Sequence, residues 1–361
     1  MIVDVEPIRT IDLNPGDNLF QSPLWAGFRS RQNYEILPFR FRYAESSSRA
    51  LAMLRPLGRD LSFAYLPWAP DLLVEEDRQG RLLEALSEAL REYLPTTCAF
   101  IRWDLSWKSP YQIDDSEAAE PGNTGRPPNR IRELRMNFNT DHWNLVKAPT
   151  NSQPVDTVVL NPRRGESALL SDMKTKTRYN IRLSFRKGVE VENAPLDKLH
   201  LWYEMYARTM ERKGVKAGPY SYFATLFEAV ETLPPPLRPR LRLLLAKKGG
   251  EYLAGIVLAI TGRYALYLYG ASAPRKRNLM PTYRLQWEAI QEAKRSGCSA
   301  YDLHGVPANK SSSNPMYGLL QFKTGFGGEL IHRRGCWDYP LDHEIYRQAA
   351  AKEAAESGYY V

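Results

Sequence analysis

Three strand-like segments joined by two short turns, followed by a helix and one more strand, constrain the fold of this chain more than any other feature. The segments are rich in Leu, Ile, Val and Tyr and cover residues 240–246, 252–260 and 264–270. The links Lys247-Lys-Gly-Gly and Thr261-Gly-Arg are short enough only for antiparallel neighbours. A helix is then predicted over 281–296, with Pro281 near its start and Gly297 as its stop, and 300–306 reads as a strand.

This order of an antiparallel meander, a helix, a strand and a further helix is that of a GNAT-type acyltransferase fold, in which the fourth and fifth strands splay and the acyl donor lies between them. A strand over 153–160 and a helical stretch over 166–187 precede the meander. In the first half, strands at 51–54, 62–67 and 98–104 flank a helix within 75–93, where leucines recur at helical spacing. Residues 114–130 contain turn formers without hydrophobic periodicity and predict a mobile loop.

The length of 361 residues fits two domains, and 43% hydrophobic with 25% charged residues exclude general disorder. We place the first domain at 1–150 and the second at 151–327. The net charge of +8 favours RNA, nucleotide sugars or anionic lipid surfaces as partners, with a merely soluble basic surface as the alternative.

The cysteines predict neither a disulfide framework nor a zinc cluster, because Cys98, Cys298 and Cys336 are far apart and form no CxxC pair. The first residues lack the basic and apolar regions of a signal peptide. The longest apolar stretch, 252–260, is half a membrane span. We therefore expect a cytoplasmic protein that can work at the surface of the inner membrane. The five scattered histidines predict no metal site.

Seven blocks in the second half resemble the signature blocks of the FemABX family, and they occur in the family's order. They are Thr157-Val-Val-Leu-Asn, Met173-Lys-Thr-Lys-Thr-Arg-Tyr-Asn-Ile-Arg182, Lys187-Gly-Val-Glu-Val191, Tyr267-Leu-Tyr-Gly-Ala-Ser272, Pro281-Thr-Tyr-Arg-Leu-Gln-Trp-Glu-Ala-Ile290, Tyr301-Asp-Leu-His-Gly-Val306 and Gly318-Leu-Leu-Gln-Phe-Lys-Thr-Gly-Phe-Gly327. In the first half, residues 20–29 and 65–70 match more loosely.

The resemblance implies an aminoacyl-tRNA-dependent peptidyltransferase that builds the side-chain bridge of peptidoglycan. It implies an α/β (α+β) fold of two GNAT-like domains in tandem, with residues 328–361 returning to the first domain. Residues 196–240 have room only for the fold's ordinary helices, so the chain is similar to the compact members that lack a coiled-coil insertion.

A run of cations without acids covers Lys174, Lys176, Arg178, Arg182, Arg186 and Lys187. Lys174, Arg178, Arg182 and Arg186 repeat every four residues, which would place them on one face of a helix. Uncompensated cations favour a polyanion, and we expect the tRNA backbone, with a solvated face as the alternative.

Lys323 matches the lysine of the family's Phe-Lys motif, together with Phe322, and the resemblance implies that it holds the tRNA 3′ end and the reacting ester. A fixed ammonium would stabilise the oxyanion that forms when an amine attacks that ester. The alternative is a surface lysine whose stem packs on Phe322 and Phe326. Residues 322–327 also approximate the pyrophosphate loop of acyl-CoA enzymes, but Phe322 replaces its first polar residue.

For the other candidate residues, an ordinary structural role is the alternative to a functional one. Tyr267 and Tyr269 alternate with leucine, so we expect them on one face of their strand, where Tyr269 would contact substrate. The resemblance implies that Arg29 and Arg212 bind the diphosphate of the precursor, as arginine can bidentately. It also implies that Asp104 orients or deprotonates the attacking amine, although a strand-end aspartate in a turn is the alternative.

The sequence thus predicts a monomeric enzyme without cofactor that transfers an amino acid from aminoacyl-tRNA to a stem-peptide amine of a UDP-linked or lipid-linked peptidoglycan precursor. The ester is already activated, so positioning and charge stabilisation would suffice. An acyl-CoA-dependent N-acyltransferase and a non-catalytic RNA-binding protein on the same fold remain as alternatives.

Overall fold

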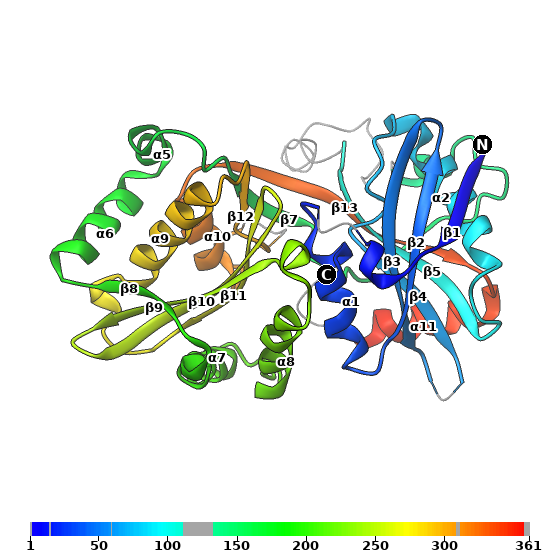
Figure 1. The fold of residues 1–361 in the computed structure, drawn as a ribbon. Helices are drawn as coiled ribbons and strands as arrows, with labels where there is room; N and C mark the ends of the chain where they lie inside the picture. The colour runs from blue at the N-terminus through cyan, green and yellow to red at the C-terminus, as the bar shows by residue number, and fades with distance from the viewer. Residues whose placement is uncertain (1, 14–15, 59, 111–132, 308–310, 357–361) are drawn as a thin grey trace, which may run out of the picture. The chain divides into compact units, whose positions relative to one another are not determined.

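The chain forms two compact units in the computed structural model, which describes all residues except 1, 14–15, 59, 111–132, 308–310 and 357–361 (Figure 1). Unit 1 comprises Met1–Asn14, Phe20–Val155 and Ile331–Val361, and unit 2 comprises Pro15–Leu19 and Asp156–Leu330. The loop predicted over 114–130 lies wholly outside the described residues.

Unit 1 is built on a mixed sheet with the strand order β1-β2-β3-β4-β5-β13. Its strands are β1 (Val3–Pro7), β2 (Glu35–Tyr43), β3 (Ser46–Pro56), β4 (Ser62–Pro67), β5 (Cys98–Lys108) and β13 (Glu329–Pro340), with the short β6 (Val146–Lys147) beside β13. Among the described strands of unit 1, β4 and β5 are the parallel pair, and they are joined through a helix. The predicted strand, helix and strand of this half are confirmed.

Within the described part of unit 1, the sheet is accompanied by α1 (Pro23–Ser30), α2 (Gln79–Arg91) and α11 (His343–Glu356). The leucines of α2 at positions 82, 83, 86 and 90 are all buried, as their spacing predicts. They pack with Trp103 of β5 and Trp337 of β13 in one core. The indole of Trp103 also donates to the Ser87 hydroxyl of α2 at 2.9 Å.

The C-terminal segment belongs to unit 1, which confirms the predicted return of the chain. Strand β13 pairs with β5 in antiparallel register, for example Trp337 opposite Trp103. The buried guanidinium of Arg102 on β5 donates to both carboxylate oxygens of Asp338 at 2.7 and 2.8 Å, and also to Glu353 of α11 at 2.8 and 2.9 Å. This network fixes both β13 and α11 to β5.

Unit 2 contains the predicted meander in a sheet with the order β7-β12-β11-β10-β9-β8. The strands are β7 (Asp156–Leu160), β8 (Glu190–Ala194), β9 (Arg240–Lys248), β10 (Glu251–Thr261), β11 (Tyr264–Ser272) and β12 (Ala300–Asp302). Strands β9, β10 and β11 pair antiparallel, and β11 is parallel to β12.

The helices of unit 2 cover both faces of its sheet (Figure 1). One side carries α7 (Leu199–Arg212) and α8 (Tyr220–Glu231), and the other carries α5 (Glu166–Asp172), α6 (Thr175–Arg186), α9 (Pro281–Arg295) and α10 (Tyr317–Thr324). The prediction of one helix over 166–187 is wrong, because extended backbone at Met173 and Lys174 separates α5 from α6.

Strands β11 and β12 part after three residue pairs, ending at Leu266 and Asp302. The last strand is shorter than the predicted 300–306, because His304 adopts a left-handed backbone with φ of 57°. The chain nevertheless stays attached to β7, since the amides of Leu303 and Val306 donate to the carbonyls of Val158 and Asp156. The splay that the GNAT order predicts therefore opens between β11 and residues 303–306.

Among the described residues, no helix is both long and apolar enough to cross a membrane.

Candidate functional site

Lys323 places its ammonium at the splay between β11 and residues 303–306. Helix α10 directs the side chain inward, and only 5% of the residue is exposed. Its Nζ donates to the carbonyl oxygens of His304 at 2.9 Å and Gly305 at 2.6 Å, and lies 5.3 Å from the ring centroid of Tyr267. The alternative of a surface lysine is therefore wrong.

The buried position of Lys323 changes its acid–base behaviour. Burial lowers the pKa of its ammonium to about 7; the Asp302 carboxylate opposes this shift, and the charge of Lys213 adds to it. Near neutral pH the group is therefore available both as a cation and as a neutral amine. A group of this kind can stabilise a developing oxyanion or transfer a proton.

Tyr267 of β11 is the aromatic neighbour of the Lys323 ammonium at the splay. Burial raises the pKa of its phenol to about 12, so the hydroxyl stays protonated at neutral pH. A Cβ added at Gly270 would lie 1.7 Å from this hydroxyl. Glycine at position 270 therefore leaves the space that the Tyr267 side chain occupies.

Tyr269 lies on the other face of the sheet, so the prediction that both tyrosines share a face is wrong. The pairing of β11 with β10 shifts between Val257 and Leu258, which leaves Leu268 as an extra residue between the two tyrosines. Such a bulge reverses the alternation of side chains. Tyr269 consequently contacts α8, where its hydroxyl lies 2.9 Å from that of Tyr222 and its ring 5.2 Å from that of Phe223.

Asp302 is a buried carboxylate of this site that the sequence reasoning did not single out. It accepts hydrogen bonds from the Tyr264 hydroxyl at 2.6 Å, the His304 amide at 2.6 Å and the Thr157 hydroxyl. These bonds fix the turn whose carbonyls hold Lys323. The sequence did contain a signal for Asp302, because Thr157 and Asp302 both lie in blocks that resemble those of the family.

Phe322 is half-buried and packs beside Lys323 rather than lining an open surface. Its ring lies 5.1 Å from those of Tyr283 and Phe326. Residues 322–324 form the last turn of α10, and Gly325 packs so closely that an added Cβ would lie 2.4 Å from the Thr177 hydroxyl. This segment is therefore a packed helix end and not a loop open to an anion.

Arg212 is exposed at the end of α7 and reaches the end of β11. Its Nη2 donates to the carbonyl of Ser272 at 3.1 Å and lies 3.3 Å from the hydroxyls of Ser272 and Thr209. The next residue, Lys213, is the one whose charge depresses the Lys323 pKa. Lys213 thus adds positive charge within electrostatic reach of the splay.

The predicted cationic stripe divides into two groups. Lys174 precedes α6 and its Nζ lies 3.1 Å from Gln321 Oε1 and 3.3 Å from Thr324 Oγ1 of α10. Arg178 donates to the last carbonyls of α5, at Leu170, Ser171 and Met173. Arg182 and Arg186 are exposed on α6. The four residues therefore do not form one uniform face.

Asp104 is a buried residue of unit 1 within β5, and not at a strand end as the sequence suggested. It accepts hydrogen bonds from the Tyr65 hydroxyl at 2.8 Å and the Gln153 amide at 3.0 Å. Burial raises its pKa to about 6, and the hydrogen bonds from Tyr65 and Gln153 oppose this shift. With 2% exposure, the carboxyl is held by protein groups and does not open to solvent.

Arg29, also in unit 1, lies in the last turn of α1 and is half-buried. Its Nη1 donates to Gln32 Oε1 at 2.7 Å, and its guanidinium stacks 4.1 Å from the Tyr34 ring centroid. Its Nε makes no hydrogen bond with any described residue. The Tyr34 ring and Gln32 therefore hold the guanidinium in place.

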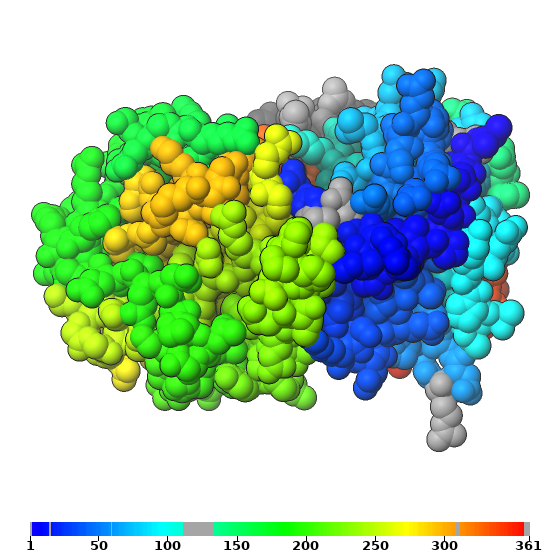
Figure 2. Space-filling view, in the orientation of Figure 1, coloured from blue at the N-terminus to red at the C-terminus, as the bar shows by residue number. Residues whose placement is uncertain are grey.

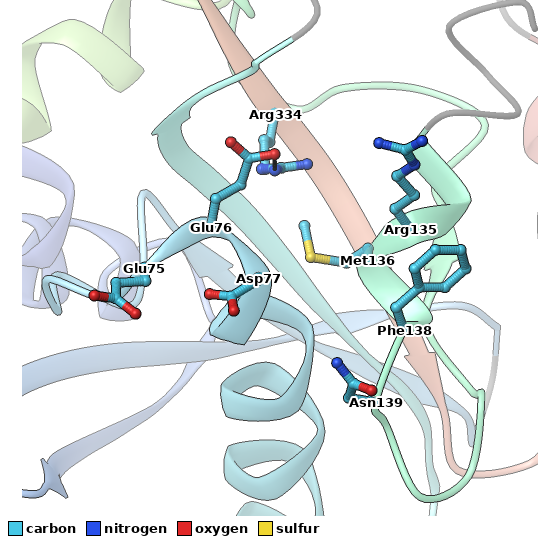
Figure 3. A pocket seen from close by; sticks show the side chains of 8 residues that line it. All are labelled: Glu75, Glu76, Asp77, Arg135, Met136, Phe138, Asn139 and Arg334. Atoms are coloured by element: carbon cyan, nitrogen blue, oxygen red, sulfur yellow. Dashed lines mark ion pairs between the residues drawn. The ribbon is translucent and has the colours of Figure 1, made fainter.

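A separate cavity of about 520 Å³ lies in unit 1 and contains none of the predicted site residues (Figure 3). Its lining consists of Glu75, Glu76, Asp77, Arg135, Met136, Phe138, Asn139 and Arg334. Arg334 is buried and lies 3.5 Å from Glu76 and 3.1 Å from Glu133. The Lys323 site is the stronger candidate, because a buried amine with its pKa lowered to about 7 lies there at a strand splay.

Three comparisons with known proteins show what this chain is similar to. The model of the FemAB family matches residues 11–232 and 241–353. Lipid II:glycine glycyltransferase of Staphylococcus saprophyticus is 25% identical over 251 residues, which are 54% of this chain and 60% of that protein. The Staphylococcus aureus protein of the same name is 23% identical over 256 residues, 54% and 61% of the two chains.

The crystal structure of FemX superposes with a TM-score of 0.75 at 17% identity and covers 96% of this chain and 100% of FemX. This likeness confirms the mixed α/β fold. The chain spans about 60% of the length of the curated relatives it matches.

Proposed function

The chain belongs to the FemAB family, and from this membership and the geometry around Lys323 we propose that it transfers an aminoacyl group from aminoacyl-tRNA to a stem-peptide amine of a peptidoglycan precursor. The names of the Staphylococcus relatives, Lipid II:glycine glycyltransferase, support a precursor as acceptor. Use of tRNA as the donor is our own step, and it is supported by the exposed cations of α6.

One observation carries the proposal: a buried ammonium is held at the splay of β11 and β12 by two carbonyls. Burying a cation costs several kcal/mol, and the nearby Asp302 carboxylate offsets only part of this cost, because the Lys323 pKa is still lowered. Its position is therefore better explained by a reaction that uses the charge than by packing.

The proposed reaction needs few groups from the protein. The acceptor amine attacks the ester carbonyl, the carbonyl electrons move onto oxygen, and the tetrahedral intermediate collapses to an amide while the 3′ oxygen of the tRNA leaves and takes a proton. Lys323 stabilises the oxyanion as a cation and, with its pKa near 7, can supply that proton; the neutral amine so formed takes up the proton that the attacking nitrogen loses, which restores the ammonium. The activated ester supplies the driving force.

The remaining candidates take supporting roles in this proposal. Arg29 and Arg212 bind the precursor diphosphate, since a guanidinium can contact two phosphate oxygens at once. Asp104 acts as a positioning residue rather than as the base, because its carboxyl is buried and hydrogen-bonded. Tyr267 and Phe322 shape the splay around Lys323, and Tyr269 with Tyr222 would contact substrate from the other face of the sheet.

The acyl-CoA alternative fits the molecule less well. The segment that approximates a pyrophosphate loop is the packed end of α10. The turn between β11 and α9, residues 273–280, contains no glycine that would let a backbone approach a pyrophosphate closely. A non-catalytic RNA-binding protein would gain nothing from a buried Lys323.

We further propose that the protein works as a monomer in the cytoplasm, with peripheral contact to the inner membrane where a lipid-linked acceptor would lie. Purified protein incubated with a set of charged tRNAs and with soluble and lipid-linked precursors, read by mass spectrometry, tests the function. We expect one precursor to gain the mass of an amino acid. Transfer from acyl-CoA, or no gain with any charged tRNA, would contradict the proposal.

A further inference from the structure

Two large aromatic side chains lie uncovered on α6 among its cations. Tyr179 is 55% exposed and Phe185 is 49% exposed. Lys176, Arg182 and Arg186 are exposed around them, and no acidic residue occurs between Lys174 and Val189. We call Lys176, Tyr179, Arg182, Phe185 and Arg186 the α6 outer face. Figure 2 shows the green segment that includes α6 at the surface of unit 2.

The two rings lie beside guanidinium groups rather than in an apolar cluster. Arg186 lies 5.9 Å from the Tyr179 ring centroid, and Arg284 of α9 lies 4.1 Å from that of Phe185. Among the described residues, none of Lys176, Arg182 and Arg186 takes part in an ion pair. Their charges are therefore available to a polyanion.

The inward side of α6 already packs against the rest of unit 2. Ile181, with Thr177, Asn180 and Ser184, is buried against the rest of unit 2. A helix that inserts into a lipid surface needs a broad apolar face turned outward, whereas here the outward side consists of two rings separated by cations. Planar aromatic and guanidinium groups interleaved with positive charge are instead the composition that binds unpaired nucleotides, because bases stack on the planes and phosphates pair with the cations.

The α6 outer face begins next to the Lys323 site. The amide of Lys174 donates to the carbonyl of Gly325 at 2.9 Å, and Lys174 Nζ reaches Gln321 and Thr324 of α10. Helix α6 has 12 residues, which gives a length of about 18 Å at 1.5 Å per residue. Four stacked nucleotides at 3.4 Å each extend about 14 Å, so the unpaired end of an RNA can follow this helix to α10.

We propose that the α6 outer face binds the unpaired 3′-terminal nucleotides of the donor tRNA by stacking on Tyr179 and Phe185, and so leads the esterified end toward Lys323. This inference rests on the proposed function for the identity of the RNA. Binding itself needs no transfer reaction, so it can be tested alone.

The probes are two fluorescent acceptor-stem RNA hairpins, one with a four-nucleotide unpaired 3′ end and one blunt. We expect the wild-type protein to prefer the hairpin with the unpaired end. The double variant Tyr179→Leu, Phe185→Leu should lose about tenfold or more of that affinity, and should bind the blunt hairpin as before. The variant Arg182→Gln, Arg186→Gln should weaken both hairpins and reduce the salt slope by about two.

Trp143→Leu is the matched control, because Trp143 is 57% exposed in unit 1, and it should change neither affinity. Equal effects of the ring variant on both hairpins, or none on either, would overturn the inference. Binding of wild-type protein to vesicles of anionic lipid in competition with RNA would also overturn it in favour of a membrane surface. If the ring effect appears but no charged tRNA supports transfer, the inference stands and the proposed function fails.

Discussion

At the scale of single residues, Lys323 shows what a sequence can and cannot say about a candidate site. Its place in a Phe-Lys block identified it, but its burial was not predictable, because lysine is almost never fully buried without a partner. The structure supplies the reason in the two carbonyls that accept from its Nζ. Those carbonyls depend on the left-handed turn at His304, which no local pattern indicates.

Replacing Lys323 should separate binding from catalysis. We expect Lys323→Met to keep the fold and most precursor binding but to lower kcat about a hundredfold or more, because one preorganised donor to the oxyanion is lost. Lys323→Arg should not restore full activity, since a planar guanidinium cannot place its charge between the same two carbonyls. Single-turnover transfer from pre-charged tRNA measures this effect. Near-normal turnover in Lys323→Met would show that the amine has no catalytic role.

Asp104 should make stability depend on pH in mild acid. Its pKa is about 6 in the folded protein against 3.8 ordinarily, so between these values the folded state binds the proton more tightly. The free energy of unfolding should therefore fall by about 2 kcal/mol as pH rises from 4 to 6, which is the larger part of a total of about 3 kcal/mol at 1.36 kcal/mol per pKa unit.

The variant Asp104→Asn cannot titrate and should lack this decline. Urea denaturation of both proteins at pH 4, 5, 6 and 7 measures the difference between them. Parallel profiles for the two proteins would mean that the buried carboxyl does not titrate in this range.

At the scale of secondary-structure elements, periodicity predicted most of unit 2 but missed two local changes. The strands of the meander and helix α9 agree with prediction within a few residues, because turn residues and Pro281 mark their ends. The bulge at Leu268 was missed, since leucine and tyrosine alternate through it without a break. The break between α5 and α6 was also missed, because Met173 and Lys174 are good helix formers.

Substitutions at Arg178 and Arg182 should change the free energy of unfolding by different amounts, although the two residues are one turn apart on α6. Arg178 satisfies the C-terminal carbonyls of α5, so Arg178→Gln should lower the free energy of unfolding by about 1 kcal/mol. Exposed Arg182 forms no such bond, so Arg182→Gln should stay within about 0.5 kcal/mol of the wild type. Thermal unfolding of the full chain measures the loss in each of the two variants. Equal losses would contradict the division of the cationic stripe into structural and free groups.

At the scale of the whole molecule, the return of the C-terminal segment was predicted only through the family resemblance. Arg102 and Asp338 are 236 residues apart, and no periodicity or turn signal encodes a pairing at that separation. The contact depends instead on chemistry, because an arginine buried in β5 requires a carboxylate, and Asp338 and Glu353 supply two. Both ends of the chain therefore belong to unit 1, and unit 2 is formed mainly by the segment between them.

Breaking this network should loosen unit 1 and leave unit 2 unchanged. Arg102→Met leaves Asp338, which is fully buried, without its cation, and this should cost about 3 to 5 kcal/mol. Glu353→Gln should cost less, because the Glu353 side chain is 27% exposed and can be hydrated. Hydrogen exchange read by mass spectrometry should become faster in β5, β13 and α11 of Arg102→Met.

The double variant Arg102→Met, Asp338→Leu is the control for this reading, because it removes the stranded carboxylate along with its partner. We expect it to recover much of the lost protection, as apolar replacement of a complete buried ion pair often does. Exchange in β8 to β12 should match the wild type in all of these variants, because Arg102 and its partners lie wholly within unit 1. Faster exchange in both units would instead mean that the two units unfold together, and that the C-terminal segment stabilises the entire chain rather than unit 1.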